Sequence, residues 1–397
     1  MSKKKYTQLE EDEELYGRNR RKKKKKKSKV KVLFTEVIVL LLLLVVLAVY
    51  QKTFGQIDFL DDLTDSEAGI NDDANLLALE GYTNIALFGL DNRSSGDYDS
   101  GNSDTIIIAS INNETKEVQL VSVYRDTLLS IGNGKYRKAN AAYAKGGATQ
   151  AVAMLNTNLD LDITEYVCVD WVALVEAIDA LGGVDIEIAS NEITALNECI
   201  PEIDWQTGYS TKKITESGLQ HLDGTQATAY ARIRSTSGDD YLRSSRQRIV
   251  LQAMLSAAKE ASLSELTTMC TEIFDDISTT LSVTQLIGLA KDVASYEIVS
   301  TTGFPYELTT KTLSTTGSTI VPVVLENNVE ELHYYLFGEE NYVVSDTVKL
   351  ISDSIIETSG VDEDYENLVD TSLYNETVGA DGTADTKEQN KETSTED

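Results

Sequence analysis

Arginine is concentrated in one short part of this chain. Five of the eight arginines beyond residue 50 lie within residues 232–248. The planar guanidinium group can donate two parallel hydrogen bonds to phosphate or carboxylate oxygens. Residues beyond 50 carry 59 acidic side chains against 21 basic ones, so most of this region would repel an anion. A dense group of arginines there indicates that something anionic is bound and neutralised.

The spacing of these arginines predicts two groups of neighbours. If the chain is a strand at Arg232 and Arg234, the two side chains share one face, because side chains in a strand alternate. In a helix, Arg243, Arg246 and Gln247 lie at positions i, i+3 and i+4 and also share one face. An anion at the N-terminus of that helix would attract both the arginines and the positive end of the helix dipole.

An internal network of ion pairs is the alternative role of the same arginines. Asp239 and Asp240 lie within the cluster and are suitable partners. Such a network would neutralise the arginines without any ligand. The sequence alone leaves both roles open.

Two aspartates at the ends of expected strands could hold a metal ion. Asp91 follows the apolar run 84–90, and Asp104 precedes the apolar run 105–111. Two such carboxylates suit Mg²⁺, which prefers oxygen ligands and would also contact a phosphate. A turn residue and a strand-edge cap are the more ordinary roles of these aspartates. Arg125 follows a third expected strand, and ligands gather at strand ends in α/β sheets.

Several classes of enzyme and binding protein are disfavoured by what the chain lacks. It has no G-x-S-x-G, Walker or H-E-x-x-H motif. It has only two histidines, His221 and His333, and three cysteines without a C-x-x-C pair. A histidine-centred triad and a Cys/His zinc site are therefore disfavoured. The net charge of −30 argues against sequence-independent binding of nucleic acid.

The elements that must position these residues indicate an α/β fold. Strand and helix patterns alternate, which predicts a layered fold with a mixed sheet. Residues 190–217, which include Trp205, show no clear pattern and are expected to be irregular. We expect strands over 84–90, 105–111, 117–124, 165–169 and 184–188, and helices over 148–159, 171–181, 243–261 and 284–295.

The N-terminal region predicts a membrane anchor. Residues 32–50 are apolar apart from Glu36 and would form a helix about 28 Å long, close to the thickness of a bilayer's hydrocarbon core. Residues 1–31 carry 14 Lys and Arg, so the positive-inside rule places this basic segment in the cytoplasm and the rest of the chain outside the cell. A cleaved signal peptide is the alternative, but its apolar run would be shorter.

Beyond the anchor the chain divides into a stalk, a domain and a tail. Residues 51–80 are acidic and weakly patterned, as expected of an extracellular stalk. Residues 81–347 carry the strand and helix patterns and are enough for one sizeable core. Residues 348–397 are rich in Ser, Thr, Asp and Glu and are expected to form a disordered acidic tail.

Seven sequence motifs, in this order, resemble the LytR-CpsA-Psr family of membrane-anchored cell-wall enzymes. Each motif alone is weak, but seven in order are specific, and they cover about residues 80–340. The motifs are NIALFGLDNR (84–93), SDTIIIASIN (103–112), VSVYRDTLLSI (121–131), KANAAYAKGG (138–147), LGGVDIEI (181–188), LDGTQATAYARIR (222–234) and GDDYLRSSRQR (238–248).

This resemblance implies both a fold and a function. The fold is a three-layer α/β/α domain that binds a polyprenyl-pyrophosphate-linked glycan in an apolar groove or tunnel. The function is that of a Mg²⁺-assisted phosphotransferase, which moves the glycopolymer to peptidoglycan and releases polyprenyl phosphate. The implied partners are the lipid-linked glycan, peptidoglycan and membrane lipid, with no nucleic acid.

The resemblance also implies roles for individual residues. The implied metal ligands are Asp91 and Asp104. The implied catalytic residues are Asp91, Asp104, Arg125 and Asp240. The implied pyrophosphate-binding residues are Arg93, Arg125, Lys138, Arg232, Arg234, Arg243 and Gln247. The family often has proline where this chain has Tyr124, so the shape beside Arg125 is expected to differ.

Two other functions remain open at the level of sequence. One is a regulator that binds a lipid-linked glycan without catalysis, and the other is a hydrolase acting on the same pyrophosphate. The Asp91 and Asp104 pair argues against the regulator, because binding alone needs no activating metal. A hydrolase and a transferase would need the same arginines, so the sequence does not separate them.

Overall fold

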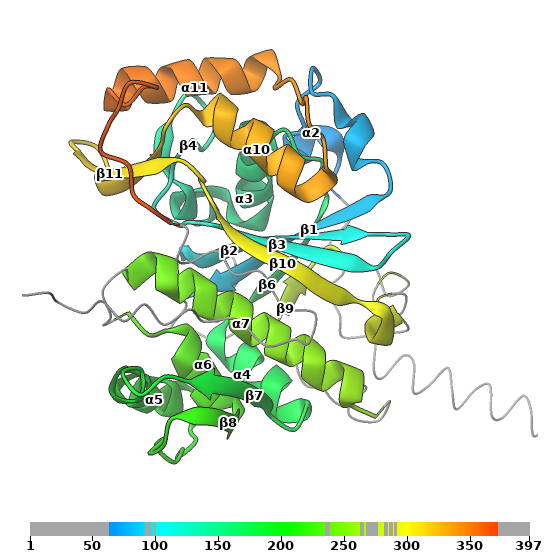
Figure 1. Cartoon of the computed structure of the whole chain (residues 1–397), viewed down its shortest axis with the longest axis vertical. Helices are drawn as coiled ribbons and strands as arrows, with labels where there is room; N and C mark the ends of the chain where they lie inside the picture. Colours follow the sequence, from blue (N-terminus) through cyan, green and yellow to red (C-terminus); the bar gives the residue numbers. More distant parts are fainter. Residues whose placement is uncertain are drawn as a thin grey trace, which may run out of the picture. The chain divides into compact units, whose positions relative to one another are not determined.

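A six-stranded mixed β-sheet forms the centre of the fold (Figure 1). The computed structural model of the chain describes residues 63–371, apart from gaps at 92–96, 99–100, 235–238, 263–265, 267–276, 282–284, 286–288 and 290–291. The strand order is β10-β3-β2-β1-β6-β9. These strands are β1 (Tyr82–Leu90), β2 (Ser103–Asn112), β3 (Glu117–Val123), β6 (Glu165–Val169), β9 (Ile277–Thr279) and β10 (Glu297–Phe304).

The expected mixed sheet is confirmed by the directions of the strands. β1 runs parallel to β6, and β3 runs parallel to β10. The other three neighbouring pairs are antiparallel. The smaller described elements are α2 (Asp65–Ala68), η1 (Leu76–Leu79), β4 (Leu128–Ser130), β5 (Tyr136–Lys138), η2 (Ala139–Ala141), η4 (Val293–Ser295), β11 (Leu308–Leu313) and β12 (Gly317–Pro322).

Helices cover both faces of the central sheet (Figure 1). Alternate residues of β1 point to opposite faces, as the period of a strand requires. Ala86 and Phe88 join the larger hydrophobic core, whereas Ile85 and Leu87 face a second one. Over the first face lie α3 (Tyr143–Leu159), α10 (Leu325–Phe337) and α11 (Asp346–Ser359). Over the second face lies the long helix α7 (Asp239–Glu260).

A smaller lobe with its own core lies beside α7 on the second face. Its elements are α4 (Trp171–Ala180), β7 (Val184–Ile188), α5 (Ile193–Thr207), β8 (Gly218–Leu222) and α6 (Gly224–Ala231). Val175, Ile186, Leu196 and Ala229 are buried in this core, together with Val250 of α7. The lobe thus places α6 next to the sheet. Arg232 and Arg234, which follow α6, are placed there with it.

Helix α6 begins at a close contact with α4. The side chain of Asp223 caps the helix, and Gln226 completes the capping box. The Gly224 N–H donates a hydrogen bond of 2.7 Å to Oδ1 of Asp179. A Cβ atom at Gly224 would collide with the backbone carbonyl of Val175, so only glycine allows this approach. The pair Asp223-Gly224 is typical of a turn, but here it begins a helix.

Two local predictions within the domain are wrong. Residues 193–207, expected to be irregular, form the helix α5, whose apolar residues include Leu196 and Ile203. Arg232 and Arg234 do not lie on a strand, because Arg232 caps the C-terminus of α6 and Arg234 follows in a loop. Half of the helix expected over 284–295 falls outside the described residues.

The folded domain extends beyond both of its predicted ends. Part of the predicted stalk 51–80 is folded, since Ala68 of α2 is buried and η1 follows it. The predicted tail 348–397 begins inside α11, where Val348 and Ile355 are buried in the main core. The spacing of apolar residues in α11 is helical, but the polar composition of the whole segment obscured it.

The predicted membrane helix at residues 32–50 lies outside the described residues. Among the residues that the structure does describe, no helix is both long enough and apolar enough to cross a membrane. The anchor and the orientation that it implies therefore stay predictions.

Candidate functional site

An apolar cavity of about 480 Å³ lies between the second face of the sheet and the helices α4 to α7. Leu87 and Val167 line it from the sheet, and Leu174 lines it from α4. Val250 and Met254 line it from α7. The cavity exists partly because small residues stand where larger ones would fill the space. These residues are Ala173, Ala177, Ala195 and Ala231.

Polar residues predicted from the sequence line the same cavity. They are Asp104, Arg232, Arg234, Arg243 and Gln247. Residues from β2, the end of α6 and the start of α7 are thus brought together, although about 130 positions separate Asp104 from Arg234 in the chain. An apolar space that is joined to a group of arginines can accept a ligand with an apolar chain and an anionic head.

Asp104 is the centre of the arginine group. Its Oδ1 accepts a hydrogen bond of 2.8 Å from Nη1 of Arg125, and its Oδ2 accepts one of 2.7 Å from Nη2 of Arg234. Nη2 of Arg243 lies 3.5 Å from the Asp104 backbone oxygen. Asp104 therefore holds three guanidinium groups near each other, two through its carboxylate and one near its backbone oxygen.

Asp240 is a second bridge between two of these arginines. Its Oδ1 lies 3.1 Å from Nη2 of Arg243 and 3.5 Å from Nη2 of Arg125. Lys138 instead pairs with Asp126, at 3.2 Å. The ion-pair network considered as an alternative is thus present, although its main carboxylates are Asp104 and Asp240. The side chain of Asp239 lies outside the described part of the chain.

This network does not satisfy all of the arginine donors. Arg243 is 3% exposed, and its Nε and Nη1 atoms make no hydrogen bond to any described residue. Burial and the neighbouring charge of Arg125 lower the pKa of Arg243 to about 10. Burial also disfavours the charged form of Arg125, but Asp104 and Asp240 outweigh it and raise the pKa of that group. Buried cations with unsatisfied donors favour a further anion.

Arg232 stands apart from this network. Its Nη2 atom donates a hydrogen bond of 3.2 Å to Oε2 of Glu202 on α5. Its guanidinium group lies over the ring of Trp171, the first residue of α4. Burial lowers the pKa of Arg232, and its buried Nη1 atom has no hydrogen-bond partner among the described residues.

Asp91 is the second carboxylate that could hold a metal ion. It is exposed at the end of β1, yet partial desolvation and the charge of Asp104 raise its pKa. A divalent cation beside both carboxylates would remove this repulsion, so the donor set fits Mg²⁺. In the described part of the chain, no group of three or more His, Cys, Asp or Glu residues could hold a metal ion. Further ligands would have to come from water and phosphate.

The structure places most, but not all, of the predicted site residues. Arg125, Arg234, Arg243 and Asp240 gather around Asp104. Lys138 reaches this group only through Asp126, and Arg93 lies outside the described residues. Sequence reasoning missed Trp171, Glu198, Cys199 and Glu202, which also line the cavity. The last three share a face of α5, a signal that was lost because this helix was not recognised.

Arg246 has a different role from Arg243 and Gln247, although its spacing predicted that all three share one face of the helix. Its Nε atom donates a hydrogen bond of 2.8 Å to Glu192, and its Nη1 atom donates one of 3.2 Å to the Ile233 carbonyl. Both partners are buried. Arg246 therefore joins α7 to the smaller lobe.

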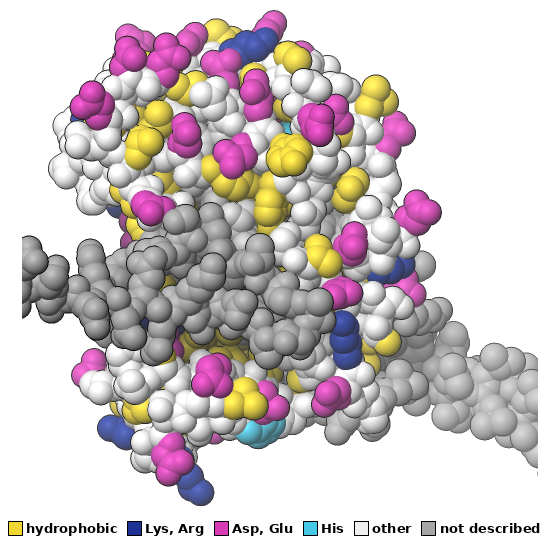
Figure 2. Space-filling model, viewed as in Figure 1, with side chains coloured by type: hydrophobic (Ala, Val, Ile, Leu, Met, Phe, Trp, Pro, Cys, Tyr) yellow, Lys and Arg dark blue, Asp and Glu magenta, His cyan; other side chains and the backbone are white. Residues whose placement is uncertain are grey.

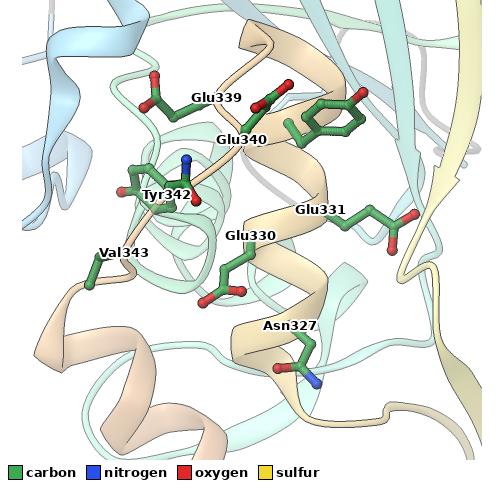
Figure 3. Close-up of a pocket in the computed structure, with 9 residues that line it drawn as sticks. Asn327, Glu330, Glu331, Glu339, Glu340, Tyr342 and Val343 are labelled. Atoms are coloured by element: carbon green, nitrogen blue, oxygen red, sulfur yellow. The ribbon is translucent and has the colours of Figure 1, made fainter.

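A second pocket, of about 550 Å³, has the opposite character (Figure 3). Glu330 and Glu331 of α10, together with Glu339 and Glu340 beyond it, line this pocket. Figure 2 shows many acidic side chains and few basic ones on the visible face of the molecule. An anionic ligand is repelled by such surfaces, so the arginine group beside the apolar cavity is the candidate site.

Comparison with known proteins gives a consistent result. The model of the LytR_cpsA_psr family matches residues 45–336. A teichoic acid transferase of Enterococcus faecalis, named TagU, is 33% identical over 214 residues, which are 53% of this chain and 65% of that protein. Biofilm regulatory protein A of Streptococcus mutans is 32% identical over 202 residues, which are 48% of each chain. The chain thus spans about half to two thirds of these relatives.

A solved structure described as TagT bound to LI-WTA has the same fold. Its TM-score is 0.54, and the match covers 70% of this chain and 98% of that one. The sequence identity is 21%, so this comparison supports the fold alone.

Proposed function

We propose that this chain, which belongs to the LytR-CpsA-Psr family, transfers a glycopolymer from a polyprenyl-pyrophosphate carrier to peptidoglycan. The observation that carries this proposal is the arginine group that lines the apolar cavity. A ligand that suits both must join a long apolar chain to a compact, multiply charged anion, and a polyprenyl pyrophosphate does so. The name of the Enterococcus relative, a polyisoprenyl-teichoic acid–peptidoglycan teichoic acid transferase, is in line with this substrate class.

In the proposed reaction, an acceptor hydroxyl oxygen of peptidoglycan attacks the phosphorus atom that carries the glycan. The bond between this phosphorus and the bridging oxygen breaks, and the bridging oxygen leaves with polyprenyl phosphate. The hydroxyl proton must pass to a base. We assign this role to Asp240, whose carboxylate contacts both Arg125 and Arg243 beside the place where the phosphates would lie.

The arginines would stabilise the charge that accumulates on the phosphate oxygens during this displacement. Arg243 and Arg232 have buried donors that form no hydrogen bond within the described part of the chain, and these donors could bind an anion. Phosphoryl transfer relies mainly on such positioning and charge neutralisation. Gln247, one helical turn from Arg243 along α7, lines the same cavity and supplies a neutral donor.

Asp91 and Asp104 are the residues that would hold Mg²⁺. When bound, the ion would neutralise charge on the pyrophosphate that the arginines do not reach. Asp104 already accepts hydrogen bonds from Arg125 and Arg234, so it would position the arginines and the ion in one site.

The proposed reaction also requires a particular location in the cell. The lipid carrier and peptidoglycan meet at the outer surface of the cell membrane. We therefore propose that residues 32–50 form the single membrane helix, that residues 1–31 remain in the cytoplasm and that the cavity lies outside. Membrane lipid then keeps the domain close to its substrate.

The test is a reaction of the full-length chain with a lipid-linked glycan and peptidoglycan oligomers, with and without Mg²⁺. We expect a product whose mass equals the oligomer plus the phospho-glycan, together with free polyprenyl phosphate. A free phospho-glycan formed without the acceptor would instead identify a hydrolase. Tight binding of the lipid-linked glycan without any product would identify a regulator, as the name of the Streptococcus relative suggests.

A further inference from the structure

We propose that Trp171 and Glu202 are positioning residues, which orient the guanidinium group of Arg232 toward the pyrophosphate. The inference rests on the proposed function, because it explains how one arginine of that site is held. Neither residue belongs to the arginine motifs of the sequence. Both were found only because the structure brings α4 and α5 to the end of α6.

The backbone at Arg232 does not by itself fix the side chain. Arg232 caps the C-terminus of α6, and the chain leaves regular structure directly after it. A long side chain at such a position has many rotamers, and ordering them costs free energy each time a ligand binds. Contacts from neighbouring elements are therefore needed to hold the group in one orientation.

Trp171 supplies the contact that holds the guanidinium group from one side. The central carbon of Arg232 lies 2.9 Å from the centroid of the indole ring. Trp171 itself is fixed as the first residue of α4, where the Asp170 side chain caps the helix by accepting a hydrogen bond of 2.9 Å from the Ala173 N–H. A planar cation over a tryptophan ring is held by cation–π attraction.

Glu202 holds one edge of the guanidinium group. Its Oε2 accepts a hydrogen bond of 3.2 Å from Nη2 of Arg232. With Nη2 occupied, Nη1 becomes the next donor available to a ligand. Nη1 is buried, has no hydrogen-bond partner among the described residues, and belongs to a side chain that lines the cavity. A buried donor without a partner is unfavourable, and a phosphate oxygen would satisfy it.

Glu202 could instead be a simple counter-ion that competes with the substrate for Arg232. The two roles have opposite consequences. Removing a competitor would tighten the binding of pyrophosphate and leave turnover unchanged or higher. Removing a positioning residue would leave the charge of Arg232 in place but lower turnover, because transition-state stabilisation depends on orientation. The free Nη1 atom favours the positioning role, since Glu202 occupies one edge of the group and leaves another available.

The first experiment measures transfer by full-length variants at Glu202. We expect Glu202→Ala to lower kcat about tenfold and to change KM less than about threefold, because a charge-assisted hydrogen bond is lost while Arg232 stays charged. Glu202→Gln keeps an acceptor oxygen and should recover most of the loss. The control is Glu187→Gln, which removes the same charge from an exposed position of the same lobe. Melting temperatures should agree among all of these variants.

The second experiment uses the ring of Trp171. Trp171→Leu should lower kcat, and Trp171→Phe should recover part of it because an aromatic face remains. The control is Trp205→Phe, since Trp205 is 75% exposed and does not line the cavity. In the Trp205→Phe background Trp171 is the single tryptophan of the chain. Titration with geranylgeranyl pyrophosphate should then change its fluorescence, and Arg232→Ala should abolish that change.

The outcomes separate this inference from the proposed function. If the Trp171 and Glu202 variants behave like their controls while Arg232→Ala loses binding, the positioning role is wrong and the pyrophosphate site stands. An equal loss in Glu202→Ala and Glu202→Gln with falling melting temperatures would also overturn it, in favour of a structural role. If Arg232→Ala binds and transfers normally, Arg232 is no pyrophosphate ligand and the positioning role is overturned, whereas the arginines around Asp104 are tested separately by Arg243→Met.

Discussion

At the scale of single residues, Asp104 decides how the site is organised. Its two carboxylate oxygens bind Arg125 and Arg234, and its backbone oxygen approaches Arg243. The two roles considered for the arginines, ligand binding and internal ion pairs, are therefore not exclusive. The ion pairs hold the guanidinium groups in place, and a buried donor that none of the described residues satisfies, such as Nε of Arg243, remains for an anion.

Replacing Arg243 by methionine should separate binding from stability. The variant keeps most of the apolar volume of the side chain but removes a buried cation whose charged form is disfavoured by burial and by Arg125. We expect the melting temperature to change little, while affinity for geranylgeranyl pyrophosphate falls roughly 10- to 150-fold. Isothermal titration and thermal unfolding of the full-length variant would measure both. An unstable variant with normal affinity would show that Arg243 serves only the internal network.

His333 should make the domain sensitive to acid. It is fully buried, its ring stacks on Tyr342, and its Nε2–H donates a hydrogen bond of 2.9 Å to the Leu159 carbonyl. Burial lowers the pKa of His333 to about 4, below the value of about 6.5 in the unfolded chain. The stabilisation is thus complete above pH 6.5 and is lost as the pH falls toward 4, by roughly 3 kcal/mol.

Urea unfolding of the His333→Gln variant between pH 4 and 7 would check this expectation. The variant keeps a donor for the Leu159 carbonyl but does not titrate, so its free energy of unfolding should depend less on pH. His221→Gln is the matched control. His221 is exposed, and its hydrogen bond to Asp185 raises its pKa, so its contribution is lost as the pH rises and has the opposite sign. Equal pH dependence in wild type and His333→Gln would contradict the prediction.

At the scale of elements, the sequence predicted regular, strongly patterned segments well. Residues 165–169 and 184–188 form strands with the expected bounds, and α4 begins at Trp171 as expected, with Asp170 as its cap. Strand alternation and helix caps are local signals, so one sequence suffices to find them. The mixed sheet followed from these elements, because their order restricts the layers that can form.

The failures share a physical cause, which is that tertiary contacts override a weak local pattern. Helix α5 contains Pro201 and several polar residues, and it is held by packing on α6 through residues such as Ile200 and Ile203. The site residue Glu202 was missed for this reason. The spacing of the arginines and the sequence motifs identified the candidate arginine group. No local signal in the sequence shows that Trp171 contacts Arg232.

Helix α11 should be essential for the stability of the domain. Deleting residues 353–397 removes the buried residues Ile355 and Val361 from the main core. Losing a large buried side chain typically costs about 2–5 kcal/mol, so we expect the melting temperature to fall by many degrees. Deleting 372–397 removes none of the contacts described here and is the matched control. Two truncations with the same melting temperature would show that α11 contributes nothing.

The alanines of α4 should determine whether the cavity can accept a lipid. Ala177 is buried and lines the cavity, so Ala177→Leu would fill part of that space. We expect affinity for geranylgeranyl pyrophosphate to fall at least about tenfold, affinity for inorganic pyrophosphate to stay the same, and stability to be kept or increased because a void is filled. Ala180→Leu, on the same helix but away from the cavity, is the control. A parallel loss of both affinities would count against a separate lipid subsite.

At the scale of the whole molecule, charge separates the two ends of the chain. Residues beyond 50 carry a net charge of −38, whereas residues 1–31 carry 14 basic side chains. A strongly acidic domain is repelled by an anionic membrane surface, and a basic segment is attracted to it. The arginine group is therefore a local exception, and it is the place on the described domain where we expect an anion to bind.

The proposed topology can be tested on intact cells whose wall has been removed. A protease added from outside should digest residues 51–397 and leave the basic segment 1–31 protected, because the positive-inside rule keeps that segment in the cytoplasm. Antibodies against tags at the two ends would report the fragments. A C-terminal tag that survives in intact cells and is digested only after lysis would reverse the orientation.

The volume of the apolar cavity has a consequence for how the protein would meet its proposed substrate. An engineered cavity of about 150 Å³ holds one benzene molecule, so a space of about 480 Å³ holds about 18 carbons. Only the first few isoprenoid units next to the pyrophosphate would enter, and the remainder of a longer tail would stay in the bilayer. The tail then acts as a tether. Under the proposed function, carrier and protein would find each other by lateral diffusion, the amount of lipid per membrane area would set the encounter rate, and the spent carrier would return to the bilayer without entering water.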